Sequence, residues 1–161
     1  MQIRPEEFIV AALLHDIGHL LPGPEHAGLG RIAHQNVGAD YLKQLKFSPT
    51  VVELVRSHVD AKRYLVAKEK SYYENLSDAS KQTLKLQGGP MTPQECLHFE
   101  NDPLFECKIL LRQIDELAKN VDCTYISMNL SDFCKKDEGE EVEVLPDLES
   151  YQDVIESCLM N

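Results

Sequence analysis

The chain has 161 residues, and 43% of them are apolar, which is enough to bury the core of a single domain. Its 27 acidic residues outnumber its 16 basic residues, so that the formal net charge is -11. This balance argues against nucleic acid or a membrane surface as the main partner, although a local cluster of cations could still bind a small anion.

The first predicted helix begins at Pro5 and leads to an adjacent histidine and aspartate. Proline suits the first position of a helix because it needs no hydrogen-bond donor there, and the two glutamates that follow it meet the positive end of the helix dipole. Apolar residues then recur at helical spacing until Gly18, which we expect to stop the helix. His15 and Asp16 are therefore predicted on its last turn.

A loop and a second helix are predicted next. Residues 21–29 contain two prolines and two glycines, a composition typical of a loop. The helix that follows covers about residues 31–45 and carries His34 on its first turn. Helical spacing predicts an inward face of four apolar residues, Ile32, Val37, Tyr41 and Leu45.

The third predicted helix has a clear beginning, with Ser48 as its cap and Pro49 as its first residue. Two valines, His58 and Lys62 then follow at steps of four, three and four residues, which places them on one stripe of the helix. A histidine and a lysine are thereby predicted beside core valines.

Three further helices complete the predicted core. Ser77 caps a short one, and residues 92–95 form a capping box before another. Asp102 starts the last strong helix, whose inward face includes Asp115. No alternating strand pattern of useful length precedes the end of this helix, so we predict an all-α fold, a helical bundle.

The periodic pattern weakens after this helix. We place the folded domain at residues 1–119 and an acidic C-terminal tail at residues 120–161. Within the tail, residues 148–160 could form one amphipathic helix.

Cysteine usage and hydropathy indicate a compartment. The five cysteines are an odd number with no C-x-x-C pair, which is typical of reduced thiols. The chain has no charged-then-apolar leader, and no apolar run approaches the roughly 18 residues that a membrane span needs. We therefore expect a soluble, cytoplasmic protein that is not bound to a membrane.

Several polar residues on the predicted inward faces are candidate metal ligands. A carboxylate at the end of an apolar helix loses hydration, so something positive should face Asp16. Besides the adjacent His15, its candidate companions are His34, His58 and Asp115, each on a different predicted helix. Imidazole and carboxylate together suit iron, manganese, cobalt or zinc better than calcium, and they argue against a thiolate zinc site.

The number of candidates indicates more than one ion. His15, Asp16 and Asp115 with one further ligand would satisfy a single metal, so the additional pair His34 and His58 indicates a second ion bridged by Asp16. Any one of these histidines alone is more easily explained as an ordinary buried or surface residue. The set as a whole favours a metal site.

Four side chains near these ligands could contact an anionic substrate. They are His19, Lys62, Ser80 and Arg112. A phosphate-like group near the metals would need such donors to balance its charge. Each also has an ordinary explanation: the arginine could pair with Asp115 or Glu116, the lysine and the serine could point to solvent, and His19 could cap a helix end.

Six segments resemble one known family. They are LLHDIGHLL (13–21), AHQNVGADYL (33–42), SHVDAKRYL (57–65), LSDAS (76–80), LQGGPM (86–91) and LLRQIDELAK (110–119). Together they are similar to the PhnZ-type phosphonate-cleaving diiron oxygenases of the HD superfamily. The HD pair alone is a weak signal, whereas its combination with HV-x-AKRYL and QGGPM is specific.

The resemblance implies an HD-domain bundle with a mixed-valence pair of irons, in which other divalent metals could also bind. Such an enzyme uses dioxygen to oxidise 2-amino-1-hydroxyethylphosphonate, or an N-methylated analogue, to phosphate and glycine or a betaine. By the same resemblance, one iron would be held by His15, Asp16 and Asp115. Asp16 would bridge to the second iron at His34 and His58. The substrate would be contacted by His19, Lys62, Ser80 and Arg112.

One departure from the family affects the expected activity. Members carry a further histidine ligand on a helix upstream of the HD pair, and this chain begins at Met1, close before His15. We therefore expect one iron to lack a nitrogen ligand and the oxygenase activity to be reduced or absent. Two alternatives stay open at this point, a metal-dependent HD phosphohydrolase and a non-catalytic scaffold.

Overall fold

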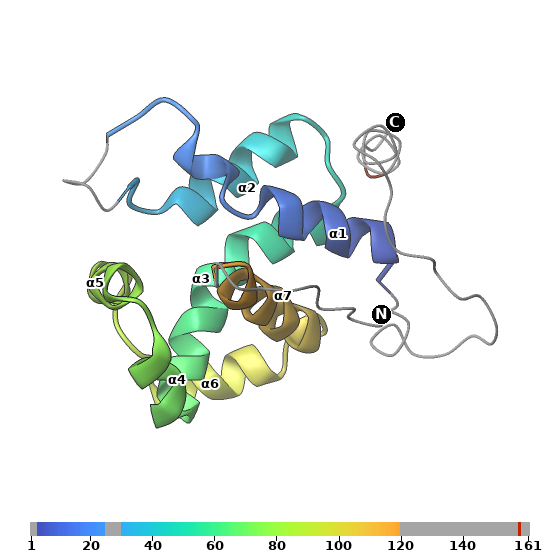
Figure 1. Cartoon of the computed structure of the whole chain (residues 1–161). Helices are drawn as coiled ribbons and strands as arrows, with labels where there is room; N and C mark the ends of the chain where they lie inside the picture. The colour runs from blue at the N-terminus through green and yellow to red at the C-terminus, as the bar shows by residue number, and fades with distance from the viewer. Residues whose placement is uncertain (1–2, 25–29, 120–157, 159–161) are drawn as a thin grey trace.

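The computed structural model describes residues 3–24, 30–119 and 158, and every regular element in these ranges is helical. The predicted all-α helical bundle is thus confirmed. In the described ranges, no helix combines the length and the apolar character that crossing a bilayer requires. The elements (Figure 1) are α1 (Pro5–Leu14), the 3₁₀ helix η1 (Ile17–His19), α2 (His34–Gln44), α3 (Pro49–Lys68), α4 (Lys70–Asn75), α5 (Asp78–Leu86), α6 (Pro93–Glu100) and α7 (Phe105–Ala118).

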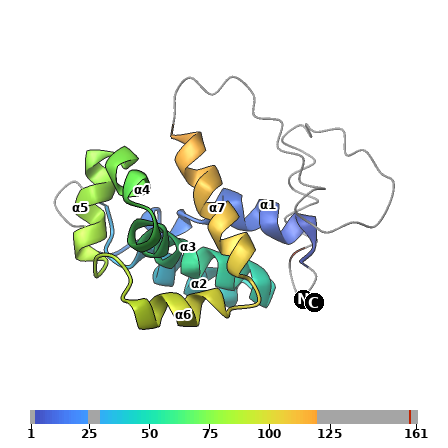
Figure 2. The same cartoon turned by 90° about the horizontal axis from the view of Figure 1, so that it is seen from below.

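Helix α3 forms the centre of the bundle. It contacts α1, α2, α4, α6 and α7, and Figure 2 shows it among the other helices. It begins as predicted, with Pro49 at its first position and the Ser48 hydroxyl accepting a hydrogen bond from the backbone N–H of Val51 (3.4 Å). Leu54 and Val55 on this helix are fully buried. The helix is therefore a rigid support for the side chains that extend from it into the site.

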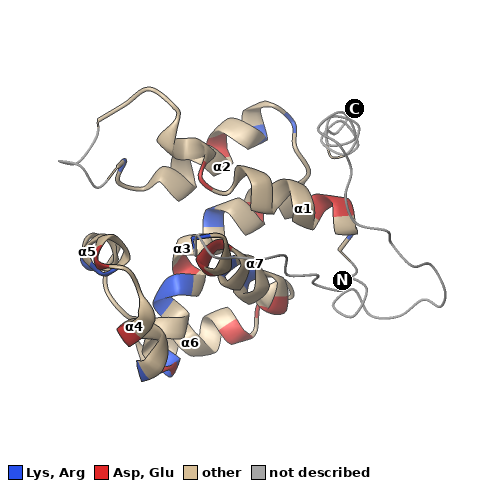
Figure 3. Ribbon diagram, viewed as in Figure 1, with Lys and Arg blue, Asp and Glu red and all other residues tan. Residues whose placement is uncertain are grey.

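Helix α7 is tied to α3 by a buried lysine. Acidic and basic residues both occur along these two helices (Figure 3). Lys108 of α7 is 3% exposed, and its Nζ lies 2.7 Å from Oε1 of Glu53 on α3 and 2.8 Å from Oδ2 of Asp102. A buried ammonium with two carboxylate partners is satisfied, so this contact fixes α7 against the central helix.

Two glycines bring the turn after α1 directly against the start of α2. A Cβ on Gly18 would lie 1.9 Å from the carbonyl oxygen of His34, and a Cβ on Gly38 would lie 3.0 Å from the backbone nitrogen of Gly18. Only residues without side chains allow this approach. The contact holds the HD pair next to the first turn of α2 and thereby next to His34.

Helix α1 is shorter than the sequence pattern predicted. It ends at Leu14, His15 is its C-cap residue, and Asp16 lies just before η1. The predicted position of this pair on the last turn of the helix was therefore wrong. Because the chain turns here, the two adjacent side chains reach different neighbours: His15 contacts α7, and Asp16 contacts α2 and α3.

Helix α2 begins later than predicted, and the face that it buries is not the predicted one. It starts at His34, because Ala33 before it has a left-handed backbone (φ 57°). Ile32, Tyr41 and Leu45 are 52%, 37% and 46% exposed, so their predicted inward orientation was wrong. The contact between the two glycines fixes the rotation of the helix instead. Its buried residues are His34, Gly38, Ala39 and Leu42.

The second half of the bundle follows the predicted caps more closely. Ser77 caps α5, and Thr92 forms a capping box at the start of α6. Helix α7 begins at Phe105 and not at Asp102, because Asp102 accepts the backbone N–H of Leu104 (2.7 Å) in the turn before it. The short helix α4 was not predicted, and none of its residues is buried.

The predicted tail and its helix at residues 148–160 lie outside the described residues, with the exception of Cys158. That residue is 1% exposed and belongs to the hydrophobic core. Its carbonyl oxygen accepts a hydrogen bond from the backbone N–H of Ser48 (3.0 Å). Cys158 is therefore joined to the beginning of α3.

Candidate metal centre

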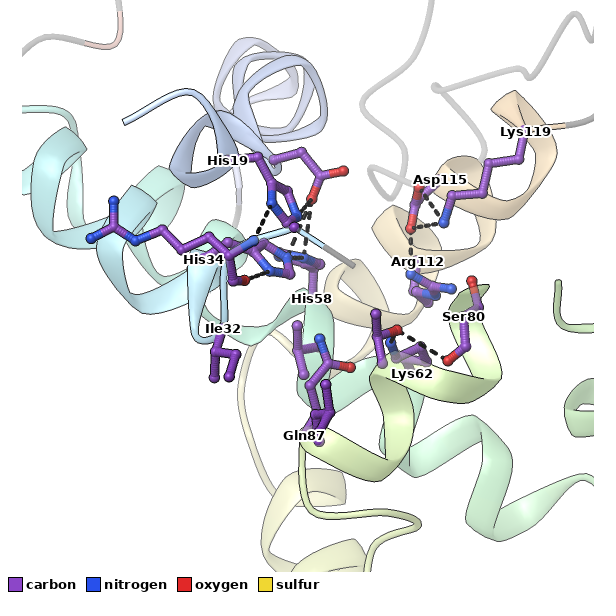
Figure 4. Close-up of a pocket in the computed structure, with 16 residues that line it drawn as sticks. His19, Ile32, His34, His58, Lys62, Ser80, Gln87, Arg112, Asp115 and Lys119 are labelled. Atoms are coloured by element: carbon purple, nitrogen blue, oxygen red, sulfur yellow. Dashed lines mark hydrogen bonds and ion pairs between the residues drawn. The ribbon is translucent and has the colours of Figure 1, made fainter. Parts of the chain in front are cut away.

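Five side chains from four parts of the bundle converge beside a pocket. Four of them line the pocket, and Figure 4 labels His34, His58 and Asp115 among the lining residues; the fifth, His15, contacts Asp16 and Asp115. Two of the five come from the link between α1 and η1, one from the first turn of α2, one from the middle of α3 and one from α7. They are the predicted ligands His15, Asp16, His34, His58 and Asp115.

The two carboxylate oxygens of Asp16 face different histidines. Oδ1 lies 3.3 Å from Nε2 of His34 and 3.6 Å from Nε2 of His58. Oδ2 lies 3.4 Å from Nε2 of His15, and that nitrogen lies 3.4 Å from Oδ1 of Asp115. Asp16 thus stands between two groups of potential ligands, where one carboxylate could serve both.

The three histidines are oriented by the same kind of hydrogen bond to the backbone. In each, Nδ1 lies close to the backbone carbonyl oxygen three residues earlier, at 2.8 Å for His15, 3.3 Å for His34 and 2.7 Å for His58. A carbonyl oxygen only accepts, so Nδ1 carries the hydrogen and donates it. In the neutral ring, Nε2 is then left with a lone pair directed into the site. This is the tautomer that a metal ligand needs.

The arrangement of these nitrogens favours a cation. The Nε2 atoms of His34 and His58 lie 2.9 Å apart, and two lone pairs at this distance repel each other unless a positive charge lies beside them. Among the described residues, Nε2 of His15 is buried without a hydrogen bond of ordinary geometry. Ligand atoms of Asp16, His34 and His58 all lie within 4.8 Å of one another, which is compact enough for one ion. The set suits iron, manganese, cobalt or zinc.

The charges of the site also favour a bound cation. Without a bound metal, burial opposes protonation of His15, but the carboxylates of Asp115 and Asp16 outweigh it and raise the pKa of His15 to about 10, so that a proton on Nε2 takes the place of a cation. Burial likewise opposes ionisation of Asp16, yet its contacts with His15 and His34 hold its pKa far below the usual range. Burial, with the positive charge of His15, lowers the pKa of His58 to about 3, so this ring is a neutral imidazole. Positive charge is therefore favoured between the carboxylates.

A cavity of about 110 Å³ opens beside the histidines and is lined by basic and hydroxyl side chains. Nζ of Lys62 donates a hydrogen bond to Oγ1 of Thr83 (3.1 Å). Burial and the positive charges of Arg112 and Lys119 lower the pKa of Lys62 to about 7. These cations are crowded together, so the pocket favours a small anion even though the chain is acidic.

The four predicted substrate contacts all line this cavity, and they are His19, Lys62, Ser80 and Arg112. Arg112 already contacts Asp115 and Glu116, and its Nε donates to the hydroxyl of Tyr72 (2.8 Å). Arg112 therefore forms the ion pairs that were its alternative explanation and also lines the pocket. Oγ of Ser80 accepts a hydrogen bond from the hydroxyl of Ser77 (3.0 Å). The roles of the four residues toward a substrate stay predictions.

The described lining also includes eight residues that were not predicted as site residues, among them Lys119, Arg31 and Gln87. Nζ of Lys119 lies 3.0 Å from Oδ1 of Asp115, and its position one turn after that aspartate on α7 is a signal that could have found it. Arg31 and Gln87 also line the cavity. They reach it from a loop and from the end of α5, where helical spacing gives no indication.

The sequence matches the HD domain family over residues 1–120. It is also similar to curated proteins. A glycine-betaine-forming 1-hydroxy-2-(trimethylamino)ethylphosphonate dioxygenase of Leisingera caerulea is 43% identical over 122 residues, which cover 74% of this chain and 62% of that protein.

Two other relatives have similar levels of identity. A hydroxymethylphosphonate dioxygenase of Gimesia maris is 38% identical over 157 residues, which cover 95% of this chain and 68% of the relative. An uncharacterized protein of Acanthamoeba polyphaga mimivirus is 41% identical over 117 residues, which cover 70% of this chain and 53% of the relative. The matched part thus spans roughly half to two thirds of the length of these relatives.

Proposed function

We propose that this chain, which belongs to the HD domain family, is a diiron oxygenase. It would use dioxygen to cleave the carbon–phosphorus bond of a small hydroxyphosphonate, as the names of two relatives suggest. The observation that carries the proposal is the position of Asp16. Its two carboxylate oxygens face separate sets of histidines beside a pocket rich in cations. Two relatives named as phosphonate dioxygenases support the substrate class.

Two groups of residues would hold the irons. His15, Asp16 and Asp115 would hold one ion, and His34 and His58 would hold the other, with Asp16 shared between them. Imidazole nitrogen and carboxylate oxygen are ligands that iron accepts. When bound, the iron would supply one-electron oxidation by dioxygen and Lewis-acid polarisation of the substrate.

The phosphonate group would bind on the side of the pocket opposite the histidines. Lys62 and Arg112 would balance its charge, and the hydroxyl of Ser80 would donate a further hydrogen bond. Figure 4 supports this orientation, because these side chains lie across the pocket from His34 and His58. The hydroxyl-bearing carbon would then be turned toward the metal ligands, so that the cations determine which bond is presented to them.

Among small hydroxyphosphonates, we propose 2-amino-1-hydroxyethylphosphonate or an N-methylated analogue as the substrate. The products would be phosphate and glycine or a betaine. The names of the two dioxygenase relatives cover a trimethylated substrate and the smaller hydroxymethylphosphonate. We place the reaction in the cytoplasm, where buried thiols such as that of Cys96 stay reduced.

Iron analysis combined with an oxygen-dependence assay tests this function. After iron loading, we expect iron binding that depends on Asp16, and any release of phosphate from the hydroxyphosphonate should require dioxygen. Asp16→Ala should lose most of the iron. Asp40→Ala is the matched control, because Asp40 is an exposed aspartate that pairs with Arg56 on the surface (2.7 Å).

Each other outcome has a distinct meaning. Phosphate release that continues without dioxygen would indicate metal-dependent hydrolysis of the HD phosphohydrolase type. Wild-type protein that takes up no iron would contradict the metal centre and favour a non-catalytic scaffold. If Asp16→Ala kept as much iron as Asp40→Ala, the ligand assignment would be wrong.

A further inference from the structure

A fourth histidine in the pocket, His19, is held differently from the three histidines of the metal centre. Its Nδ1 accepts a hydrogen bond from the backbone N–H of Arg31 (3.2 Å). An amide N–H can only donate, so in the neutral ring Nδ1 has the lone pair and Nε2 has the hydrogen. Nε2 lies 4.0 Å from Oδ1 of Asp16, and the residue lines the cavity. His19 thus offers an N–H donor where the other three offer lone pairs.

Two close contacts define the position of the His19 ring. It stacks on the ring of His34, with centroids 3.9 Å apart and an angle of 23° between the planes. The backbone at Gly30 also approaches it so closely that a Cβ there would lie 2.7 Å from Cε1 and Nδ1 of His19. Gly30 has a φ of +78°, a conformation that glycine adopts readily. Glycine at this position therefore lets the N–H of Arg31 reach the ring.

The side chain of Arg31 also holds the backbone at Gly30 and Arg31 in place through hydrogen bonds. Its Nη1 donates to the carbonyl oxygens of Leu21 (3.0 Å) and Pro22 (2.6 Å). These two residues follow η1 closely, so the guanidinium joins the chain after His19 to the chain before α2. A charge-assisted contact to two carbonyls holds the backbone N–H of Arg31 in place.

We propose that Gly30 and Arg31 are positioning residues, which fix His19 as an Nε2–H donor to an oxygen atom of the bound anion. The donor would act on the side of the pocket nearest to Asp16, whereas Lys62 and Arg112 act from the opposite side. The same tautomer keeps Nε2 of His19 from binding a metal. The identity of the anion rests on the proposed function, but the tautomer of His19 does not.

The experiment compares Gly30→Ala with Gly89→Ala. Gly89 has a similar φ of +72°, but among the described atoms a Cβ there would meet nothing within 4 Å. Both variants therefore introduce comparable backbone strain, and only Gly30→Ala displaces His19. The tautomer is measured by long-range ¹⁵N–¹H correlation of the ring nitrogens in metal-free protein at mildly alkaline pH. Loss of signals in His19→Gln assigns them, and binding of inorganic phosphate is the second measurement.

We expect wild type and Gly89→Ala to show the Nε2-protonated pattern for His19 and Gly30→Ala to lose it. Phosphate affinity should be about tenfold lower in Gly30→Ala than in Gly89→Ala, as expected for one hydrogen bond to a charged group. Arg31→Ala leaves Gly30 intact and should give a mixture of the two tautomers.

Two results would overturn the proposal. One is a wild-type His19 protonated at Nδ1, and the other is identical spectra and phosphate affinities in the two alanine variants. The spectra require neither metal nor dioxygen. Failure of this inference can therefore be told apart from failure of the oxygenase assay.

Discussion

Replacing Lys62 by methionine should stabilise the metal-free fold and weaken the binding of anions. Lys62 is 4% exposed, and its ammonium donates to Oγ1 of Thr83 (3.1 Å). Burial and the charges of Arg112 and Lys119 lower its pKa from the ordinary 10.5 to about 7. Methionine has a similar shape without the charge, so the substitution removes an electrostatic cost and creates little empty space.

The magnitude and its pH dependence follow from the same pKa. At about 1.4 kcal/mol per pKa unit, the lowered pKa of Lys62 sets an upper limit of about 5 kcal/mol on the gain in the free energy of unfolding. Solvent screening in the open cavity reduces the expected gain to about 1–3 kcal/mol. Between about pH 7 and pH 10.5 the unfolded chain binds more protons than the folded one, so wild-type stability rises with pH. The stability that Lys62→Met gains over wild type is therefore largest below about pH 7 and disappears above about pH 10.5.

Urea unfolding of metal-free protein at neutral and at strongly alkaline pH measures this difference, and titration with inorganic phosphate measures the loss of anion binding. Lys85→Met is the control, because Lys85 is an exposed lysine on α5. The reasoning is refuted if Lys62→Met is less stable than wild type at neutral pH. It is also refuted if the difference in the free energy of unfolding is the same at both pH values.

Three further substitutions test the fold and its connection to the site. Leu54→Ala should lower the free energy of unfolding by about 2–5 kcal/mol because Leu54 is fully buried, whereas Leu97→Ala, at a 62% exposed position, should change it by less than about 0.5 kcal/mol in the same urea assay. Gly18→Ala should lower both stability and metal binding, because its Cβ would overlap the carbonyl oxygen of His34; unchanged metal binding would contradict the importance of this contact. Lys108→Ala should lower the free energy of unfolding by about 2 kcal/mol, because two carboxylates lose their partner; an effect as small as that of Leu97→Ala would show that the ion pairs contribute nothing.

The sequence predicted those helix beginnings that depend on local side chains. Ser48 and Thr92 accept hydrogen bonds from the first backbone N–H groups of their own helices, so the reason for each beginning lies within a few residues. The rotation of α2 could not be predicted in this way. It depends on the contact of Gly18 with Gly38, two residues that periodicity does not connect.

The sequence indicated which residues would meet at the candidate site, and their roles as ligands stay predictions, whereas the ring nitrogen that each histidine presents could not be predicted. A histidine–aspartate pair with further histidines on separate helices indicates metal chemistry wherever the helices meet. Which nitrogen each ring presents depends on the backbone partner of the other nitrogen. That partner is a carbonyl for His34 and His58 and an amide N–H for His19, and only the folded chain determines it.

Metal and anion should support each other in this pocket. Lys62, Arg112 and Lys119 repel a divalent cation, while Asp16 and Asp115 attract one. A bound metal offsets the repulsion between the carboxylates and an incoming anion, and a bound anion offsets the repulsion between the cations and the metal. Each ligand therefore raises the affinity for the other by the same factor. In a chain with a net charge of -11, this coupling would make the pocket bind an anion more tightly when the metal is bound.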